Sequence, residues 1–104
     1  MSGGIKMDGT SDHIISTIPY FQIKRVIECN QQKFIKSEHR INLYKNKIST
    51  ISNQFDLKNV LDISFRSFSG ETGLLYLHTN QGVFAFEVNA DPTYFINEYK
   101  KLKF

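Results

Sequence analysis

Cysteine is almost absent from this chain of 104 residues, and tryptophan is absent altogether. Cys29 is the only cysteine, so an internal disulfide is excluded and a reducing compartment, most simply the cytoplasm, is expected. Alanine occurs only at Ala85 and Ala90. Because alanine is the best helix former, and because Ile, Phe, Tyr, Thr and Val are plentiful instead, the composition favours strands over helices.

Long hydrophobic runs are also missing. No segment approaches the ~20 apolar residues that a membrane helix needs. The first twenty residues lack the apolar centre of a secretion signal. Residues 1–12 are rich in Gly, Ser, Asp and Thr, which predicts a flexible tail. The first four residues, "MSGG", are either native or an expression remnant, and in the second case Met7 is the native start. Residues 13–104 are then expected to form one domain.

Aromatic residues are abundant, with nine Phe and five Tyr. Each buries a large apolar area, so a short chain can build a core from few of them. The formal net charge is only +3. Such a mild excess permits contact with an anionic surface but does not require it.

Alternation of apolar and polar residues predicts strands along most of the chain. They begin with "YFQIKRVIE" at Tyr20 and continue, after a turn or loop at "CNQQ", in "KFIKSEHRINLY", read as one bent strand or two short ones. Lys45–Asn46 is a predicted hairpin turn. "KISTIS" follows as the next predicted strand. Ile48 and Ile51 are three residues apart, so a regular strand would place them on opposite faces, and either a bulge or a strand that is apolar on both faces is expected.

The second half alternates more regularly, after an interruption at "SNQFDLKN". "VLDISFRS" places Leu61, Ile63 and Phe65 on one side. "LLYLHT" and "VFAFEV" are joined by "NQG", which is a hairpin signal. In the last of these strands, the alternation predicts a core-facing side made of Phe84, Phe86 and Val88.

The end of the chain has the pattern of a helix. Asp91 is the predicted N-cap and Pro92 the first helical residue. An apolar stripe with the helical period is formed by Phe95, Ile96, Tyr99 and Leu102. So short a helix is unstable alone. Phe95 is therefore expected to be nearly fully buried, and Tyr99 to bury its ring with its hydroxyl near water.

Three segments carry a family resemblance: "FDLKNVLDISFR", "GLLYLHTNQGVFAFEV" and "DPTYFINEYKKL". Their order resembles that of small bacterial pleckstrin-homology-like (PH-like) domains over roughly residues 39–103. The resemblance implies a mainly β fold with one C-terminal α-helix, in which a half-open barrel of about seven antiparallel strands is capped by the helix. It also implies a non-catalytic binding or scaffold module that contacts another protein or itself, since some such domains form rings through sheet edges.

Catalytic, cofactor-binding and metal-binding residues are not predicted. His13, His39 and His78 are far apart, without a Cys or carboxylate at metal-ligand spacing beside them. The acidic residues are scattered and suggest no pair for acid–base chemistry. We therefore do not expect an enzyme.

Basic residues gather around the first predicted turn: Lys24, Arg25, Lys33, Lys36 and Arg40. In PH domains that bind phosphoinositides, a Lys here is followed by a Lys/Arg-x-Arg triplet, which this chain lacks. Solvated charge on strand edges is the plain interpretation. The alternative function is binding to an anionic lipid or membrane surface through the Lys33–Arg40 region. Base stacking on Phe34 and Tyr44 is disfavoured, because an OB-fold places its helix between strands and the charge is modest.

Overall fold

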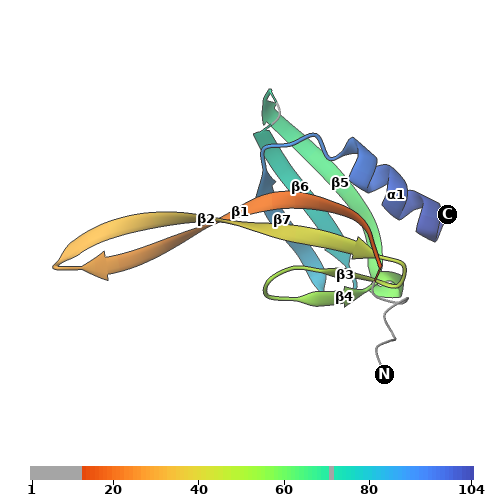
Figure 1. The fold of residues 1–104 in the computed structure, drawn as a ribbon, viewed down its shortest axis with the longest axis horizontal. Coiled ribbons are helices and arrows are strands. Elements are labelled where there is room, and N and C mark those ends of the chain that lie inside the picture. The colour runs from red at the N-terminus through yellow and green to blue at the C-terminus, as the bar shows by residue number, and fades with distance from the viewer. Residues whose placement is uncertain (1–12, 71) are drawn as a thin grey trace, which may run out of the picture.

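The computed structural model describes residues 13–70 and 72–104; the tail predicted for residues 1–12 lies outside these ranges. Most of the described chain is strand, and one α-helix closes it (Figure 1). The elements in chain order are β1 (Ile14–Glu28), β2 (Gln31–Tyr44), β3 (Lys47–Ser49), β4 (Gln54–Asp56), the 3-10 helix η3 (Leu57–Asn59), β5 (Val60–Ser69), β6 (Thr72–Thr79), β7 (Gly82–Val88) and α1 (Thr93–Lys103).

All seven strands belong to one antiparallel sheet with the order β4-β3-β2-β1-β7-β6-β5. The sheet does not close, because β4 and β5 remain its two edges. It bends so that β1 and β2 cross in front of β5, β6 and β7 in Figure 1. The predicted mainly β fold, a half-open barrel of about seven antiparallel strands capped by a C-terminal helix, is confirmed as a half-open seven-stranded sheet that is not closed into a barrel.

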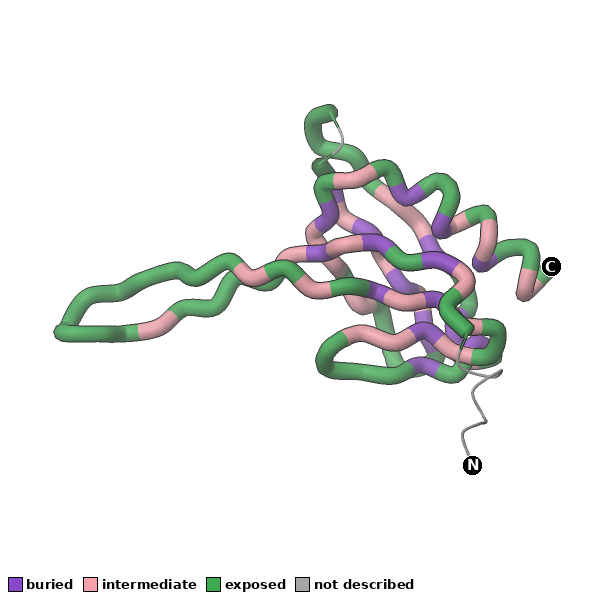
Figure 2. The backbone as a smooth tube through the Cα atoms, in the orientation of Figure 1, coloured by how far each residue is buried: buried purple, intermediate pink, exposed green. Residues whose placement is uncertain are grey.

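The core lies between the two halves of this bent sheet and α1 (Figure 2). β1 contributes Ile18 and Tyr20, while β2 contributes Ile41 and Leu43. Their spacing of two residues is the strand period that turns alternate side chains to one face. Beyond Tyr20 along β1, no residue up to Glu28 is buried.

The helix packs its predicted stripe into this core. Phe95 is 2% exposed and Tyr99 0%, which confirms the burial of both rings. The expectation for the Tyr99 hydroxyl is wrong, because it donates a hydrogen bond to the backbone oxygen of Val60. Lys103 Nζ also donates to the backbone oxygen of Leu57, at 3.0 Å. The helix therefore closes the gap between β1, which it contacts, and the start of β5.

The helix begins one residue later than predicted, at Thr93. Asp91 still stabilises its start, since a carboxylate oxygen accepts hydrogen bonds from both the Thr93 hydroxyl and the Thr93 N–H. These two bonds lower the pKa of Asp91. A stabilising contribution from this carboxylate is present above its unfolded pKa and is lost as the pH falls through the lower folded value.

Three strand predictions need correction. Of the two alternatives for "KFIKSEHRINLY", the single strand is confirmed, but β1 begins at Ile14 rather than Tyr20, and the turn is only Cys29–Asn30, so Gln31 already belongs to β2. β3 ends at Ser49, and Ile51 is 62% exposed in the following loop rather than part of a strand. "SNQFDLKN" contains β4 and η3. β3, β4 and η3 have three residues each, so a period of two residues cannot be recognised in them from the sequence.

Leu61 does not share the side of Ile63. It is 57% exposed, whereas Val60 is buried, because the register of β5 against β6 shifts between Val60 and Asp62. Such a bulge re-aims the side chains on either side of it. At the other end of this hairpin, where it pairs with Ser67, Gly73 tolerates no side chain, since a Cβ there would lie 2.3 Å from the backbone oxygen of Arg66.

Candidate functional site

A two-stranded ribbon projects from the body of the molecule (Figure 1). β7 pairs with β1 only at Phe21, and β3 pairs with β2 only at Asn42 and Leu43. Residues 22–37, here called the arm, therefore pair only with each other. They form regular antiparallel partners from Gln22–Ser37 to Glu28–Gln31. The arm and α1 lie at opposite ends of the longest dimension of the molecule, which is 52 Å.

Large apolar side chains on the arm face solvent. Four of them are between 51% and 73% exposed: Ile23, Ile27, Phe34 and Ile35. Single exposed apolar residues are normal on protein surfaces, but a gathering of them marks an interaction site. An isolated pair of strands is also marginally stable in water. The arm thus has both apolar surface and main-chain edges to offer to a partner.

The strand period divides the arm into two faces. The inner face continues the core-facing side of Tyr20 and His39, and the outer face is opposite to it. Cross-strand pairs on the outer face, from the base of the ribbon to its tip, are Pro19–Arg40, Phe21–Glu38, Ile23–Lys36, Arg25–Phe34 and Ile27–Gln32. The outer face therefore carries Ile23, Ile27 and Phe34, while the fourth exposed residue, Ile35, lies on the inner face beside Lys24.

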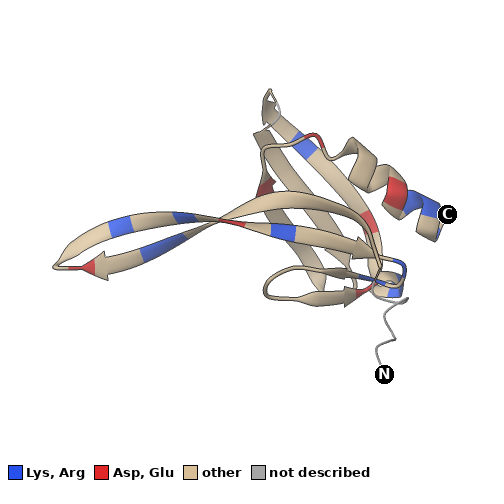
Figure 3. Cartoon of the chain, viewed as in Figure 1, with Lys and Arg blue, Asp and Glu red and all other residues tan. Residues whose placement is uncertain are grey.

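The five predicted basic residues all lie on β1 and β2, with Arg40 just outside the arm, and they do not form one cluster (Figure 3). Arg25, Lys36 and Arg40 are on the outer face, and Lys24 and Lys33 on the inner face. Two of the lysines have acidic neighbours. Lys33 Nζ lies 3.3 Å from Glu28 Oε1, and Lys36 Nζ lies 3.7 Å from Glu87 Oε2. Lys36 Nζ is also 4.5 Å from the centre of the Phe21 ring, at cation–π distance.

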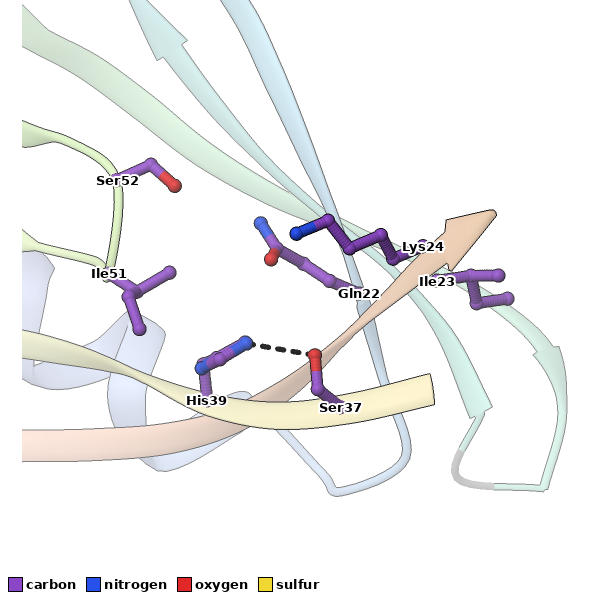
Figure 4. Close-up of a pocket in the computed structure, with 7 residues that line it drawn as sticks. All are labelled: Gln22, Ile23, Lys24, Ser37, His39, Ile51 and Ser52. Carbon is purple, nitrogen blue, oxygen red and sulfur yellow. Dashed lines mark hydrogen bonds between the residues drawn. The ribbon is translucent and has the colours of Figure 1, made fainter. Parts of the chain in front are cut away.

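A hollow of about 520 Å³ lies at the base of the arm, mainly on its inner face, where Gln22, Lys24, Ser37 and His39 line it (Figure 4). Its lining comes from the ribbon and from the loop after β3, and consists of Gln22, Ile23, Lys24, Ser37, His39, Ile51 and Ser52. His39 Nε2 and Ser37 Oγ are 3.0 Å apart. The Ile51 N–H is directed at the Tyr20 hydroxyl, 3.4 Å away, which holds the loop beside the ribbon.

Chemically, this hollow offers one ammonium group among hydroxyl, amide and imidazole groups. Such a set can hold an anionic or hydroxyl-rich group by charge-assisted hydrogen bonds. Of the predicted basic residues, only Lys24 lines it. Sequence reasoning missed Ile51 and Ser52, because nothing local shows that a loop nearly thirty residues away folds back beside Lys24.

The tip of the arm is the turn at Cys29 and Asn30, both with positive φ, of 51° and 61°. This is the backbone of a two-residue turn that favours Asn-Gly. Cys29 is exposed and forms no disulfide. Asn tolerates this conformation better than Cys does, so the strained position of the turn is Cys29.

Metal-ligating side chains do not gather anywhere in the described ranges. In residues 13–70 and 72–104, no three His, Cys, Asp or Glu side chains lie close enough together to hold a metal ion. The described part of the chain also has no helix that is long and apolar enough to cross a membrane.

Comparison of the chain with protein-family models, with curated proteins and with solved structures finds no match. What the protein does must therefore be inferred from the arm, the hollow and the fold that presents them.

Proposed function

We propose that this chain is a non-catalytic, PH-like binding module of the cytoplasm, and that the arm contacts its partner, which is another protein or a second copy. The observation that carries the proposal is the exposure of Ile23, Ile27, Phe34 and Ile35 on the arm, which pairs with no other strand that the structure describes. Full burial of such a side chain stabilises an assembly by about 1.5–3 kcal/mol relative to full exposure. A partner that covers the arm would gain part of this energy at several positions.

The separation of the arm from the buried core supports the same proposal. The buried core contains no residue between Tyr20 and Ile41, so the body does not need the arm for its packing. The PH-like assignment is supported by the half-open sheet and by the plugging of its gap by α1. A folded body from which the arm projects is suited to recognition, because the body fixes the orientation of the arm at its base.

A second candidate is contact with an anionic membrane surface. The outer face of the ribbon combines Arg25, Lys36 and Arg40 with the apolar Ile23, Ile27 and Phe34. Apolar side chains that enter the headgroup region, with cations beside them, are the usual composition of a surface-bound segment. This candidate uses a different set of cations from the predicted Lys33–Arg40 segment, because Lys33 points to the inner face.

The test of the main proposal is photocrosslinking in the cells that make the protein. A photoreactive phenylalanine analogue replaces Phe34 on the arm or, as the control, Tyr94, which is 65% exposed on α1. We expect covalent adducts with protein from position 34 and far fewer from position 94. Mass spectrometry then tells a second copy from a different protein. Equal, low yields at the two positions would refute a role of the arm in binding.

The membrane candidate is tested with vesicles of neutral lipid and of neutral lipid mixed with phosphatidylserine. Membrane contact predicts co-sedimentation with the anionic vesicles only, and weaker binding at high salt because the charges are screened. Arg25→Glu should abolish it. Equal recovery in the presence and absence of anionic lipid would refute this candidate.

A further inference from the structure

The outer edge of β2 is open for most of its length. β3 pairs only with Asn42 and Leu43, so the edge of residues 31–41 that faces away from β1 has no strand partner in the part of the chain that the structure describes. Long unpaired edges are templates for the addition of another strand. Such an addition satisfies main-chain N–H and C=O groups and extends the sheet.

We infer, on the basis of the proposed role of the arm, that a second copy of this chain adds its own β2 edge antiparallel to this one, with Ser37 at the two-fold axis, so that residues 33–41 of the two strands pair and residues 31 and 32 of each copy lie beyond the shared edge, where β3 begins. A two-fold interface presents the same surface from both subunits, so every contact occurs twice. The edge must therefore be complementary to itself. The residues on either side of Ser37 meet this requirement.

Charge is complementary in this register. Lys36 and Glu38 flank Ser37 and share the outer face. Rotation about Ser37 places Lys36 opposite Glu38 of the partner subunit, and Glu38 opposite the partner's Lys36. Opposite charges in such cross-strand positions attract, whereas like charges repel. Registers centred on Lys36 or on Glu38 would instead place that residue against its own copy.

The next pair outward is complementary as well. In the same register, Phe34 lies opposite Arg40 of the partner subunit, where the guanidinium can cover the ring by a cation–π contact. Within one chain, Phe34 already has Arg25 as its cross-strand neighbour in β1. The exposed Phe34 ring would thus lie between two arginines, Arg25 of its own chain and Arg40 of the partner subunit.

The groups that would form these pairs are available. Glu38 and Arg40 are exposed, and the structure records no ion pair for either within the described residues. Lys36 contacts Glu87 at 3.7 Å while 55% of its side chain remains exposed. A small rotation of this flexible side chain would bring it to the Glu38 of a second copy without removing a buried charge from a partner.

The experiment uses charge reversal and sedimentation velocity of the full chain across the micromolar range. Lys36→Glu alone, or Glu38→Lys alone, places two like-charged pairs across the axis. We expect each to raise the dimer dissociation constant about tenfold, because two attractive cross-strand pairs become repulsive. An equimolar mixture of the two variants should recover dimers, since both glutamates of one variant then face the two lysines of the other. The double variant should also recover the parent affinity.

Lys100→Glu is the matched control. It changes the net charge as Lys36→Glu does, but it lies at an exposed position of α1, at the opposite end of the molecule from the arm (Figure 1). Its dimer affinity should equal that of the parent. Circular dichroism of each variant verifies that the exposed substitutions leave the fold intact.

Two results would overturn self-pairing through this edge. One is a parent chain that remains monomeric over the whole range. The other is a mixture of the two single variants that dimerises no better than either alone. If the parent is monomeric while photocrosslinking at position 34 captures a different protein, self-pairing fails and the proposed role of the arm stands.

Discussion

The hydroxyl of Tyr99 donates a hydrogen bond of 2.8 Å to the backbone oxygen of Val60. Both residues are 0% exposed, so this bond joins α1 to the first residue of β5 inside the core. It connects the end of the chain to a segment 39 residues earlier. The bond explains why a helix of only 11 residues has a fixed position on the sheet.

Removal of this hydroxyl should destabilise the protein measurably. Tyr99→Phe keeps the ring but leaves the buried Val60 oxygen without its donor, which costs about 1–3 kcal/mol. A urea melt should show a lower midpoint for this variant than for the parent. Tyr94→Phe, at an exposed position of the same helix, is the control and should leave the midpoint unchanged. Identical midpoints for all three proteins would contradict the importance of the bond.

Alkaline pH should weaken the fold through the same residue. Burial, with the Asp62 carboxylate as a smaller cause, raises the pKa of Tyr99 to about 12 from its ordinary 10.0. The unfolded chain therefore loses this proton at lower pH than the folded chain does. The stabilising contribution is complete below pH 10 and is lost as the pH rises towards 12.

Urea midpoints measured across that window should fall more steeply for the parent than for Tyr99→Phe, which has no phenolic proton at this position. The remaining tyrosines are common to both proteins, so the difference between the two curves isolates Tyr99. Parallel curves would show that the Tyr99 proton does not contribute to alkaline unfolding.

Phe95 is the second anchor of the helix, and its truncation should largely unfold the protein. Phe95→Ala removes a buried ring and leaves a cavity, at a cost of about 3–5 kcal/mol. A domain of this size has only about 5–10 kcal/mol of total stability. Lys101→Ala, by contrast, removes an ion pair with Glu98 in which the lysine side chain is 72% exposed, and should leave the urea midpoint almost unchanged. Equal urea midpoints for Phe95→Ala and the parent would mean that α1 packs on nothing in its own chain.

Substitutions in the turn at the tip of the arm should stabilise the arm. Cys29→Asn combined with Asn30→Gly places the preferred residues at two positions of positive φ. Relief of one unfavourable left-handed conformation is worth about 1 kcal/mol. Amide hydrogen exchange in residues 22–37 should slow about fivefold for this gain. Gln31→Gly is the control and should speed exchange, because glycine weakens a strand. Unchanged exchange in the double variant would contradict strain at the tip.

Periodic segments were predictable from the sequence, and irregular ones were not. The helix, its stripe and the hairpin before it follow from local spacing and caps, since Phe95 and Tyr99 are neighbours on any helix. Leu61 was misplaced because the bulge beside it depends on how β5 pairs with β6. The direction of the Tyr99 hydroxyl depends on Val60, which is distant in the sequence, so no local pattern contains it.

The candidate site could be predicted only in part. The sequence shows a cluster of basic residues near the first turn, and all five lie on β1 and β2, four of them within the arm. It does not show that the turn comprises only two residues, so the length of the arm could not be predicted. Because position along a strand decides the face of each side chain, that length also decides which of the lysines and arginines lie together.

Because the arm is separate from the core, its sequence can vary in evolution without affecting the folding of the body. Substitutions in residues 22–37 leave the packing of the body untouched, so new specificities can arise there without loss of folding. Each pair of residues added at the tip would extend the reach of the ribbon by about 3.3 Å. Length and recognition can thus vary independently of the framework that supports them.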